Sequence, residues 1–173
     1  MSEDTSRTRA RGPKPTDEPG SRAAAYRAAI RLLEHQDRTV ADLRKRLTAR
    51  GFDADVVVDT LDRLQRDGFV NDARYAERYA SSMRELRGYG ARRIQLELSR
   101  RGVDQELVAS ASSVARADEQ ATADALALKR AQRLPSDMPR EQALRRLAGH
   151  LSRKGFGPDI VWAAAKRALD TAR

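Results

Sequence analysis

The chain has 173 residues, 40% of them hydrophobic and none of them cysteine, so it is long enough for one or two ordinary domains but has no disulfides or thiolate metal sites. Its 34 lysines and arginines exceed its 25 acidic residues and give a formal net charge of +9, which favours an acidic partner such as nucleic acid. No apolar run is long enough to span a bilayer and no signal peptide is recognisable, so we expect a cytoplasmic protein.

The first 21 residues contain several prolines and few apolar side chains, and we expect them to form a disordered tail. This segment holds four cations and four anions. The positive excess therefore belongs to residues 22–173, which we expect to fold.

The first helical segment is predicted over residues 23–36, with Tyr26, Ile30 and Leu33 on one face. A second helix begins at the capping box Thr39–Asp42 and ends at Gly51. After it come an apolar residue, an N-cap and the next helix.

This joint of helix, glycine, apolar residue and cap occurs twice more, at spacings of 51 and 53 residues. Its glycines are Gly51, Gly102 and Gly155, and the residues that follow them are Phe52, Val103 and Phe156. Glycine suits the end of a helix because it enters the left-handed backbone region without a steric penalty. The apolar residue is expected to fill the corner between the two helices. Caps follow at Asp53, Asp104 and Gly157, the last before Pro158.

Another helical segment precedes each of the two later joints. One ends at Gly88 and carries a stripe predicted to be buried, made of Tyr75, Tyr79, Met83 and Leu86. The other is predicted over residues 122–134. The sequence therefore predicts an all-α protein without β-sheet, built from three tandem three-helix repeats at 22–70, 71–117 and 118–173. Such repeats stack, so we expect an elongated, curved array.

The helices that end in these glycines are the basic ones. Cations in the last turn of a helix are explained by their favourable interaction with the helix dipole. In first or middle turns the dipole does not stabilise a cation, and five of the cations lie there: Arg44, Lys45, Arg46, Arg92 and Arg93. Helical projection places Leu96 among arginines, and Tyr89 is predicted to be exposed in a glycine turn. The predicted partner-contact residues are Arg44, Lys45, Arg46, Arg84, Arg87, Tyr89, Arg92, Arg93, Leu96, Arg100, Arg153 and Lys154.

Catalytic chemistry is not predicted. The two histidines, His35 and His150, lack metal-ligand spacing, and no phosphate-binding loop or nucleophile elbow is present. Tyr75, Tyr79 and Trp162 are interpreted as packing residues. We therefore expect the protein to have no catalytic activity and to bind no cofactor and no metal ion.

The run from Gly68 to Asp104 resembles the RecX family, small regulatory proteins that act on the RecA recombinase. The resemblance is carried by "DARYA" at Asp72–Ala76, "GYGARRI" at Gly88–Ile94 and "LSRRGV" at Leu98–Val103. It is most specific in the second repeat and extends over about residues 23–170. Ala91 departs from the family pattern, which commonly has proline there.

The resemblance implies a non-enzymatic protein that binds the RecA–DNA filament, and we expect the protein to be a monomer. It further implies inhibition of ATP hydrolysis, of strand exchange and of the stimulated self-cleavage of the SOS repressor, and hence control of recombination, DNA repair and the SOS response. Contact with single- or double-stranded DNA would be weaker and electrostatic. Individual contact residues do not follow from the resemblance.

Two alternatives remain open at this stage. A steep helix pair with a basic member also describes a free-standing helix-turn-helix DNA-binding protein, although the joints lack a matching set of base-reading side chains. A generic repeat adaptor for an acidic partner is the other.

Overall fold

The structure, a computed structural model, describes residues 16, 18–116 and 118–172. Most of the predicted tail lies outside these residues. Within the part that is described, Thr16 donates its backbone N–H to the carbonyl of Arg50 (2.8 Å), and the carbonyl of Pro19 accepts from Asp53 (3.1 Å). These hydrogen bonds attach the last residues before the first helix to the first glycine joint.

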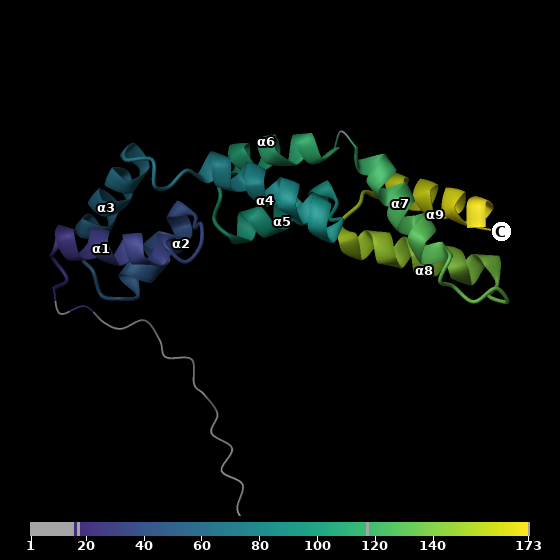
Figure 1. Cartoon of the computed structure of the whole chain (residues 1–173), viewed down its shortest axis with the longest axis horizontal. Coiled ribbons are helices and arrows are strands. Elements are labelled where there is room, and N and C mark those ends of the chain that lie inside the picture. Colours follow the sequence, from purple (N-terminus) through teal and green to yellow (C-terminus); the bar gives the residue numbers. More distant parts are fainter. Residues whose placement is uncertain (1–15, 17, 117, 173) are drawn as a thin grey trace, which may run out of the picture. The chain divides into compact units, whose positions relative to one another are not determined.

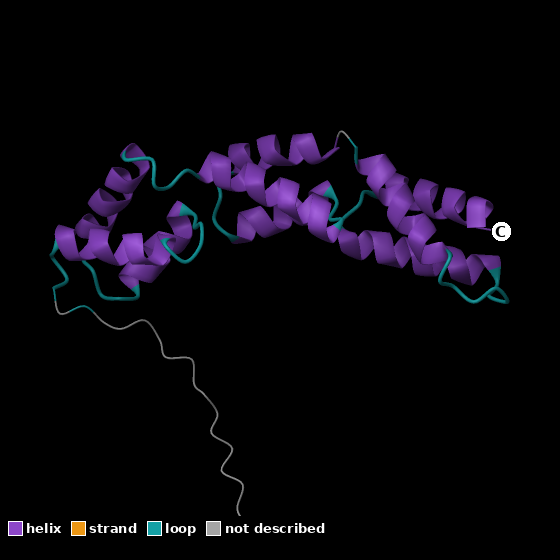
Figure 2. Cartoon of the chain, in the orientation of Figure 1, coloured by secondary structure: helices purple, strands orange, loops and turns teal. Residues whose placement is uncertain are grey.

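The described residues form helices joined by loops, without β-strands (Figure 2). The chain divides into two compact units at Val70 and Asn71. The first unit contains α1 (Arg22–Leu33), α2 (Val40–Thr48) and α3 (Ala54–Arg66). The second contains α4 (Asp72–Arg87), α5 (Ala91–Arg100), α6 (Gln105–Arg116), α7 (Glu119–Ala131), α8 (Arg140–Lys154) and α9 (Pro158–Ala172), as labelled in Figure 1. The prediction of an all-α fold made of three three-helix repeats is therefore confirmed. The exact repeat boundaries and the curved array stay predictions.

The three glycine joints share one hydrogen-bond pattern. Each glycine has a positive φ, of +86° at Gly51, +73° at Gly102 and +90° at Gly155. In each joint the residue after the glycine donates its N–H back to the carbonyl five positions earlier, which is the Schellman ending of a helix. These bonds run from Phe52 to Leu47, Val103 to Leu98 and Phe156 to Leu151, at 3.4, 3.3 and 3.3 Å. The side chains of all three donor residues are buried. The prediction that the residue after each glycine fills the corner between two helices is therefore confirmed.

A fourth ending of this kind was not predicted. Gly68 has φ +75°, and Phe69 donates its N–H to the carbonyl of Leu64 at 2.9 Å. Here the residue after the glycine is 54% exposed, and Val70 is buried in its place. This ending terminates α3 at the division between the two compact units.

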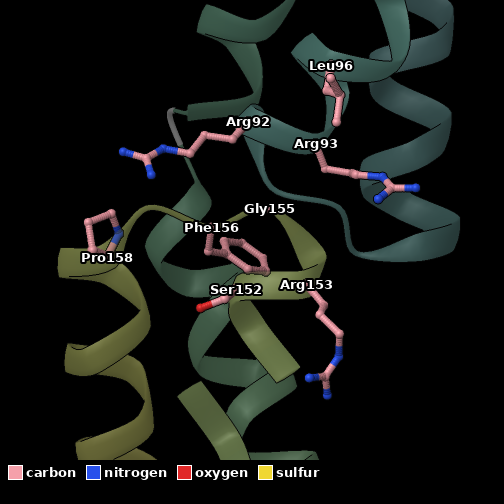
Figure 3. Close-up of a pocket in the computed structure, with 8 residues that line it drawn as sticks. All are labelled: Arg92, Arg93, Leu96, Ser152, Arg153, Gly155, Phe156 and Pro158. Carbon is pink, nitrogen blue, oxygen red and sulfur yellow. The ribbon is translucent and has the colours of Figure 1, made fainter. Parts of the chain in front are cut away.

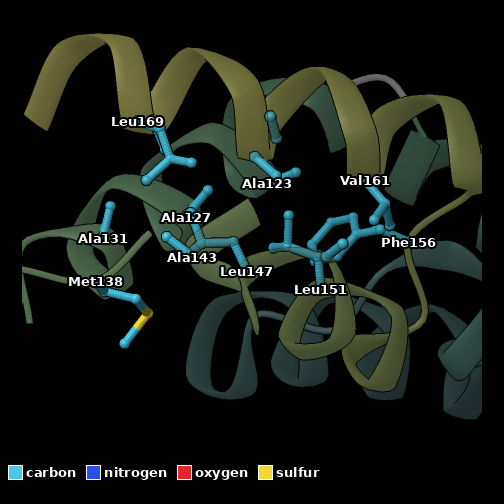
Figure 4. Packing of buried hydrophobic residues seen from close by; sticks show 14 residues of the cluster. Ala123, Ala127, Ala131, Met138, Ala143, Leu147, Leu151, Phe156, Val161 and Leu169 are labelled. Atoms are coloured by element: carbon cyan, nitrogen blue, oxygen red, sulfur yellow. The ribbon is translucent and has the colours of Figure 1, made fainter. Parts of the chain in front are cut away.

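Each repeat encloses its own hydrophobic cluster. The i, i+4 pairs predicted before the glycines are fully buried in all three: Leu43 and Leu47, Ile94 and Leu98, and Leu147 and Leu151. In the third repeat, alanines fill much of the space between α7 and α9, for example Ala123, Ala127 and Ala164 (Figure 4 labels the first two). Small side chains allow two helices to approach closely, so this interface depends on close helix–helix contact more than on large apolar side chains.

Three predictions about apolar faces are wrong in part. Leu86 is 77% exposed, because the buried side of α4 is formed by Ala76 and Ala80. Trp162 is 46% exposed, since its neighbour Val161 takes the buried position on α9. In α1 the face with Tyr26, Ile30 and Leu33 only flanks the core. The fully buried side of α1 is Ala25, Ala28, Ala29 and Leu32.

The capping box before α2 provides a test of the first repeat. The side chain of buried Thr39 accepts the N–H of Asp42 at 3.1 Å. Thr39→Ala removes this acceptor and is expected to lower the free energy of unfolding by about 1 kcal/mol in urea denaturation. Thr39→Ser keeps the hydroxyl and should lose much less. Equal losses in the two variants would show that the methyl group, and not the cap, is what matters.

Candidate partner-binding site

The second and third repeats meet through two glycine loops. The N–H of Gly90, before α5, donates to the carbonyl of Lys154, at the end of α8, at 2.9 Å. A Cβ atom on Gly90 would lie 2.6 Å from the carbonyl oxygen of Gly155, and one on Gly155 would lie 2.3 Å from Cβ of Arg93. The two loops are therefore in direct backbone contact, which only glycine permits at both positions.

Side chains strengthen the same junction. The buried carboxylate of Glu119, at the start of α7, accepts the N–H of Ala91 at 2.9 Å. The ammonium group of Lys154 donates to the carbonyl of Arg87, and it lies 5.4 Å from the centre of the Tyr89 ring. The ends of α4 and α8 and the starts of α5 and α7 are thus tied together.

A pocket of about 540 Å³ opens beside this junction (Figure 3). The residues that line it come from segments about sixty positions apart in the sequence. They are Arg92, Arg93, Leu96, Ser152, Arg153, Gly155, Phe156 and Pro158. Four of the predicted contact residues, Arg92, Arg93, Leu96 and Arg153, are therefore brought to one place.

The pocket is positively charged. Three of its eight lining residues are arginines and none is acidic. Arg92 and Arg153 are exposed, and in the part of the chain that is described neither has a carboxylate partner. Burial lowers the pKa of nearby His150 below its ordinary value, and the charges of Arg130, Lys154 and Arg153 lower it further. The end of α8 therefore stands in a field that disfavours further positive charge.

Arg93 is held differently from its neighbour. Its guanidinium is paired with Glu97 at 2.8 Å, and its Nε is buried without a hydrogen-bond acceptor among the described residues. Its Cζ lies 5.5 Å from the centre of the Tyr89 ring. Arg100 is farther from the same carboxylate, at 3.9 Å, and is largely exposed. Arg93 thus forms a wall of the pocket, while Arg92 and Arg153 are open to a partner.

The remaining predicted cations lie elsewhere on their helices. Arg44 and Lys45 are exposed on α2, whereas Arg46 pairs with Asp42 at 2.8 Å. Partial burial tends to raise the pKa of Asp42, but hydrogen bonds from Arg46 and Arg38 outweigh it, so the pKa lies below its ordinary value. On α4, Arg87 is exposed and Arg84 is partly buried.

Two predicted contact residues take part in the junction itself. Tyr89 is partly buried and packs against the core of the second repeat, so the prediction that it is exposed is wrong. Its ring also faces the two cations described above. Lys154 is partly buried, and its ammonium group donates a hydrogen bond to the carbonyl of Arg87. Glu119 was not predicted as a junction residue, because its surrounding sequence has no motif that marks a cap for another helix.

The described ranges 18–116 and 118–172 contain no group of three or more histidines and acidic residues that could hold a metal ion. No helix among them combines the length and the apolar character that a membrane span requires.

Fold and junction together define a protein of three tandem three-helix domains with a basic inter-domain pocket. Comparison with known proteins identifies each domain. The first three-helix domain of RecX matches residues 25–64, the second matches residues 71–111, and the third matches residues 117–164.

Whole-chain relatives agree with the domain matches. The regulatory protein RecX of Mycobacterium sp. (strain KMS) is 39% identical over 161 residues, covering 87% of this chain and 84% of the relative. The regulatory protein RecX of Trichlorobacter lovleyi is 38% identical over 138 residues, covering 79% of this chain and 90% of the relative. The crystal structure of RecX from Lactobacillus salivarius superimposes with a TM-score of 0.78 at 26% identity, over 87% of this chain and 97% of that one. The chain belongs to the RecX family.

Proposed function

We propose that this chain binds the RecA filament on DNA and inhibits its ATP hydrolysis, strand exchange and stimulation of repressor self-cleavage. It would thereby regulate recombination, DNA repair and the SOS response. The observation that carries the proposal is the match of all three RecX domains in their order along the chain, because the relatives that share them are named regulatory proteins. The protein would act by binding, as a cytoplasmic monomer without catalysis.

The charges of the structure support a polyanionic or acidic partner. Exposed cations on α2, α4, α5 and α8 leave each repeat with groups that can contact DNA phosphates or carboxylates on a protein surface. Repeated weak contacts along one filament raise the effective concentration of each following contact. Contact with DNA alone would be weaker and sensitive to salt.

Titration of RecA's ATP hydrolysis on single-stranded DNA tests the proposal. Addition of the protein should lower the rate in a saturable way, and the protein should sediment together with the filament. A free-standing DNA-binding protein would instead bind duplex DNA tightly without RecA and leave ATP hydrolysis unchanged. That result would refute the proposed function.

The exposed cations of α2 make the contribution of the first repeat testable. Arg44→Glu combined with Lys45→Glu should raise the concentration needed for half-inhibition by about threefold to tenfold, since exposed interfacial charges have modest effects. Both side chains are exposed, so the melting temperature should hardly change. The control is Arg27→Glu, on the neighbouring helix α1. Equal effects of the control and the double variant would indicate a general charge effect in place of a contact by α2.

A further inference from the structure

We propose that the pocket between the second and third repeats binds a short acidic segment of the partner protein. One large apolar side chain would lie against Leu96, and neighbouring carboxylates would pair with Arg92 and Arg153. This inference rests on the proposed function, because the partner that carries the segment is taken to be RecA in its filament.

The charges in the pocket select an acidic ligand. Arg92 and Arg153 reach it from α5 and α8 without a carboxylate partner in the described structure, and no acidic residue lines the pocket to compete with a ligand. Figure 3 places the Phe156 ring between Arg92 on one side and Arg93 and Arg153 on the other. Carboxylates on both sides of a central residue would therefore each find a guanidinium, which can bind them through two parallel hydrogen bonds.

The exposed leucine of the pocket distinguishes a peptide from a phosphate. Leu96 is 43% exposed and lines the pocket. A nucleic-acid phosphate would pair with the arginines but leave this apolar side chain in water. A peptide that places a leucine or phenylalanine between acidic residues satisfies both parts. The volume of about 540 Å³ lies within the range of pockets that enclose small ligands.

The junction holds the pocket in its binding shape. Arg92 lies on α5, whose first turn is fixed by Glu119 and by the contact between Gly90 and Lys154. Arg153 lies in the last turn of α8, next to that same contact. Because the two arginines stand on elements already tied together, binding needs little ordering of the backbone, and this favours affinity.

Photo-crosslinking locates the occupant. Leu96 is replaced by p-benzoylphenylalanine, and the protein is irradiated on RecA filaments assembled on single-stranded DNA. The expected crosslink joins position 96 to a RecA segment with at least one aspartate or glutamate within two residues of an apolar side chain. The matched control carries the same group at Leu86, which is exposed in the same repeat but outside the pocket, and should not label that segment.

The outcomes separate this inference from the proposed function. A protein that fails to sediment with filaments refutes the proposed function. A protein that sediments but crosslinks to DNA, to a RecA segment without acidic residues, or to nothing refutes only the pocket inference.

Charge reversal gives an independent measurement. Arg92→Glu with Arg153→Glu should weaken filament binding about tenfold. Replacing the acidic residue of the crosslinked RecA segment by lysine should restore much of the loss. Arg116→Glu with Arg133→Glu, two exposed positions outside the pocket, is the control with the same change of charge. An equal loss in the control, or no rescue by the lysine, would overturn the inference.

Discussion

Gly155→Ala is expected to lower the free energy of unfolding of the second unit by about 3 kcal/mol. Part of the loss, about 1 kcal/mol or more, arises because alanine disfavours the left-handed backbone at φ +90°. The rest is steric, since the new Cβ would lie 2.3 Å from Cβ and 2.5 Å from the backbone nitrogen of Arg93. Overpacking of this kind typically costs about 1–3 kcal/mol. Relief would require α5 to move away from α8.

Gly51 separates the two contributions. It occupies the same place in the first joint and has nearly the same φ, +86°, but the nearest atom to its added Cβ would be 4.0 Å away, on Thr16. Gly51→Ala should therefore cost only the backbone part, about 1 kcal/mol. Gly157→Ala, with no atom near its Cβ, should cost less than about 1 kcal/mol.

Urea denaturation combined with hydrogen exchange measures these losses within each unit. Faster exchange in Gly155→Ala should be concentrated at the first turn of α5 and the last turn of α8. If Gly155→Ala costs no more than Gly51→Ala, the close contact between the two glycine loops does not contribute to stability.

Gly51 and Gly155 also show which features of the fold could be predicted from the sequence. Each joint is built from residues within eight positions of its glycine, so local spacing was sufficient to predict the helix end, the buried residue after the glycine and the buried i, i+4 pairs. The second role of Gly155 depends on Arg93, sixty-two residues earlier in the chain. A repeated motif predicts each domain but not how one domain packs against the next.

The errors at single positions have a related cause. Tyr89 was predicted to be exposed because its neighbours are glycines, yet those glycines allow the third repeat to approach and cover its ring. Leu86 was assigned to a buried stripe and Trp162 was interpreted as a packing residue, but alanines on α4 and Val161 on α9 are buried instead. In closely packed helices the small residue faces the partner helix, so hydrophobicity alone selects the wrong face.

Some residues of the pocket were predicted as contact residues, but the pocket itself was not predicted. The charge pattern along α5 and α8 predicted Arg92, Leu96 and Arg153 as contact residues separately. Their convergence depends on the junction between the second and third repeats, which was not predicted. Gly155, Phe156 and Pro158 were assigned only to the joint, although they also line the pocket.

Glu119→Ala is expected to lower the free energy of unfolding of the second unit by about 2 kcal/mol, because it removes a charged acceptor from a buried amide. The helices α1, α2 and α4 are capped by their own side chains, those of Ser21, Thr39 and Asn71. Helix α5 starts after Gly90, where any Cβ would collide with the carbonyl of Gly155 and with Glu119 itself. The third repeat therefore provides the cap that the second cannot carry, and the negative charge also favours the N-terminal end of the helix dipole.

Two further variants identify the source of this loss. Glu119→Gln keeps an oxygen acceptor without the charge and should lose roughly half as much, since hydrogen bonds to charged groups are about twice as strong as neutral ones. Glu106→Ala removes an exposed glutamate from the first turn of α6 and should stay within about 0.5 kcal/mol of the wild type. The amide of Ala91 should exchange faster in Glu119→Ala than in either of the other two variants. If Glu119→Ala and Glu106→Ala lose the same stability, the carboxylate acts only through the dipole of its own helix, and its hydrogen bond from Ala91 does not help to hold the second and third repeats together.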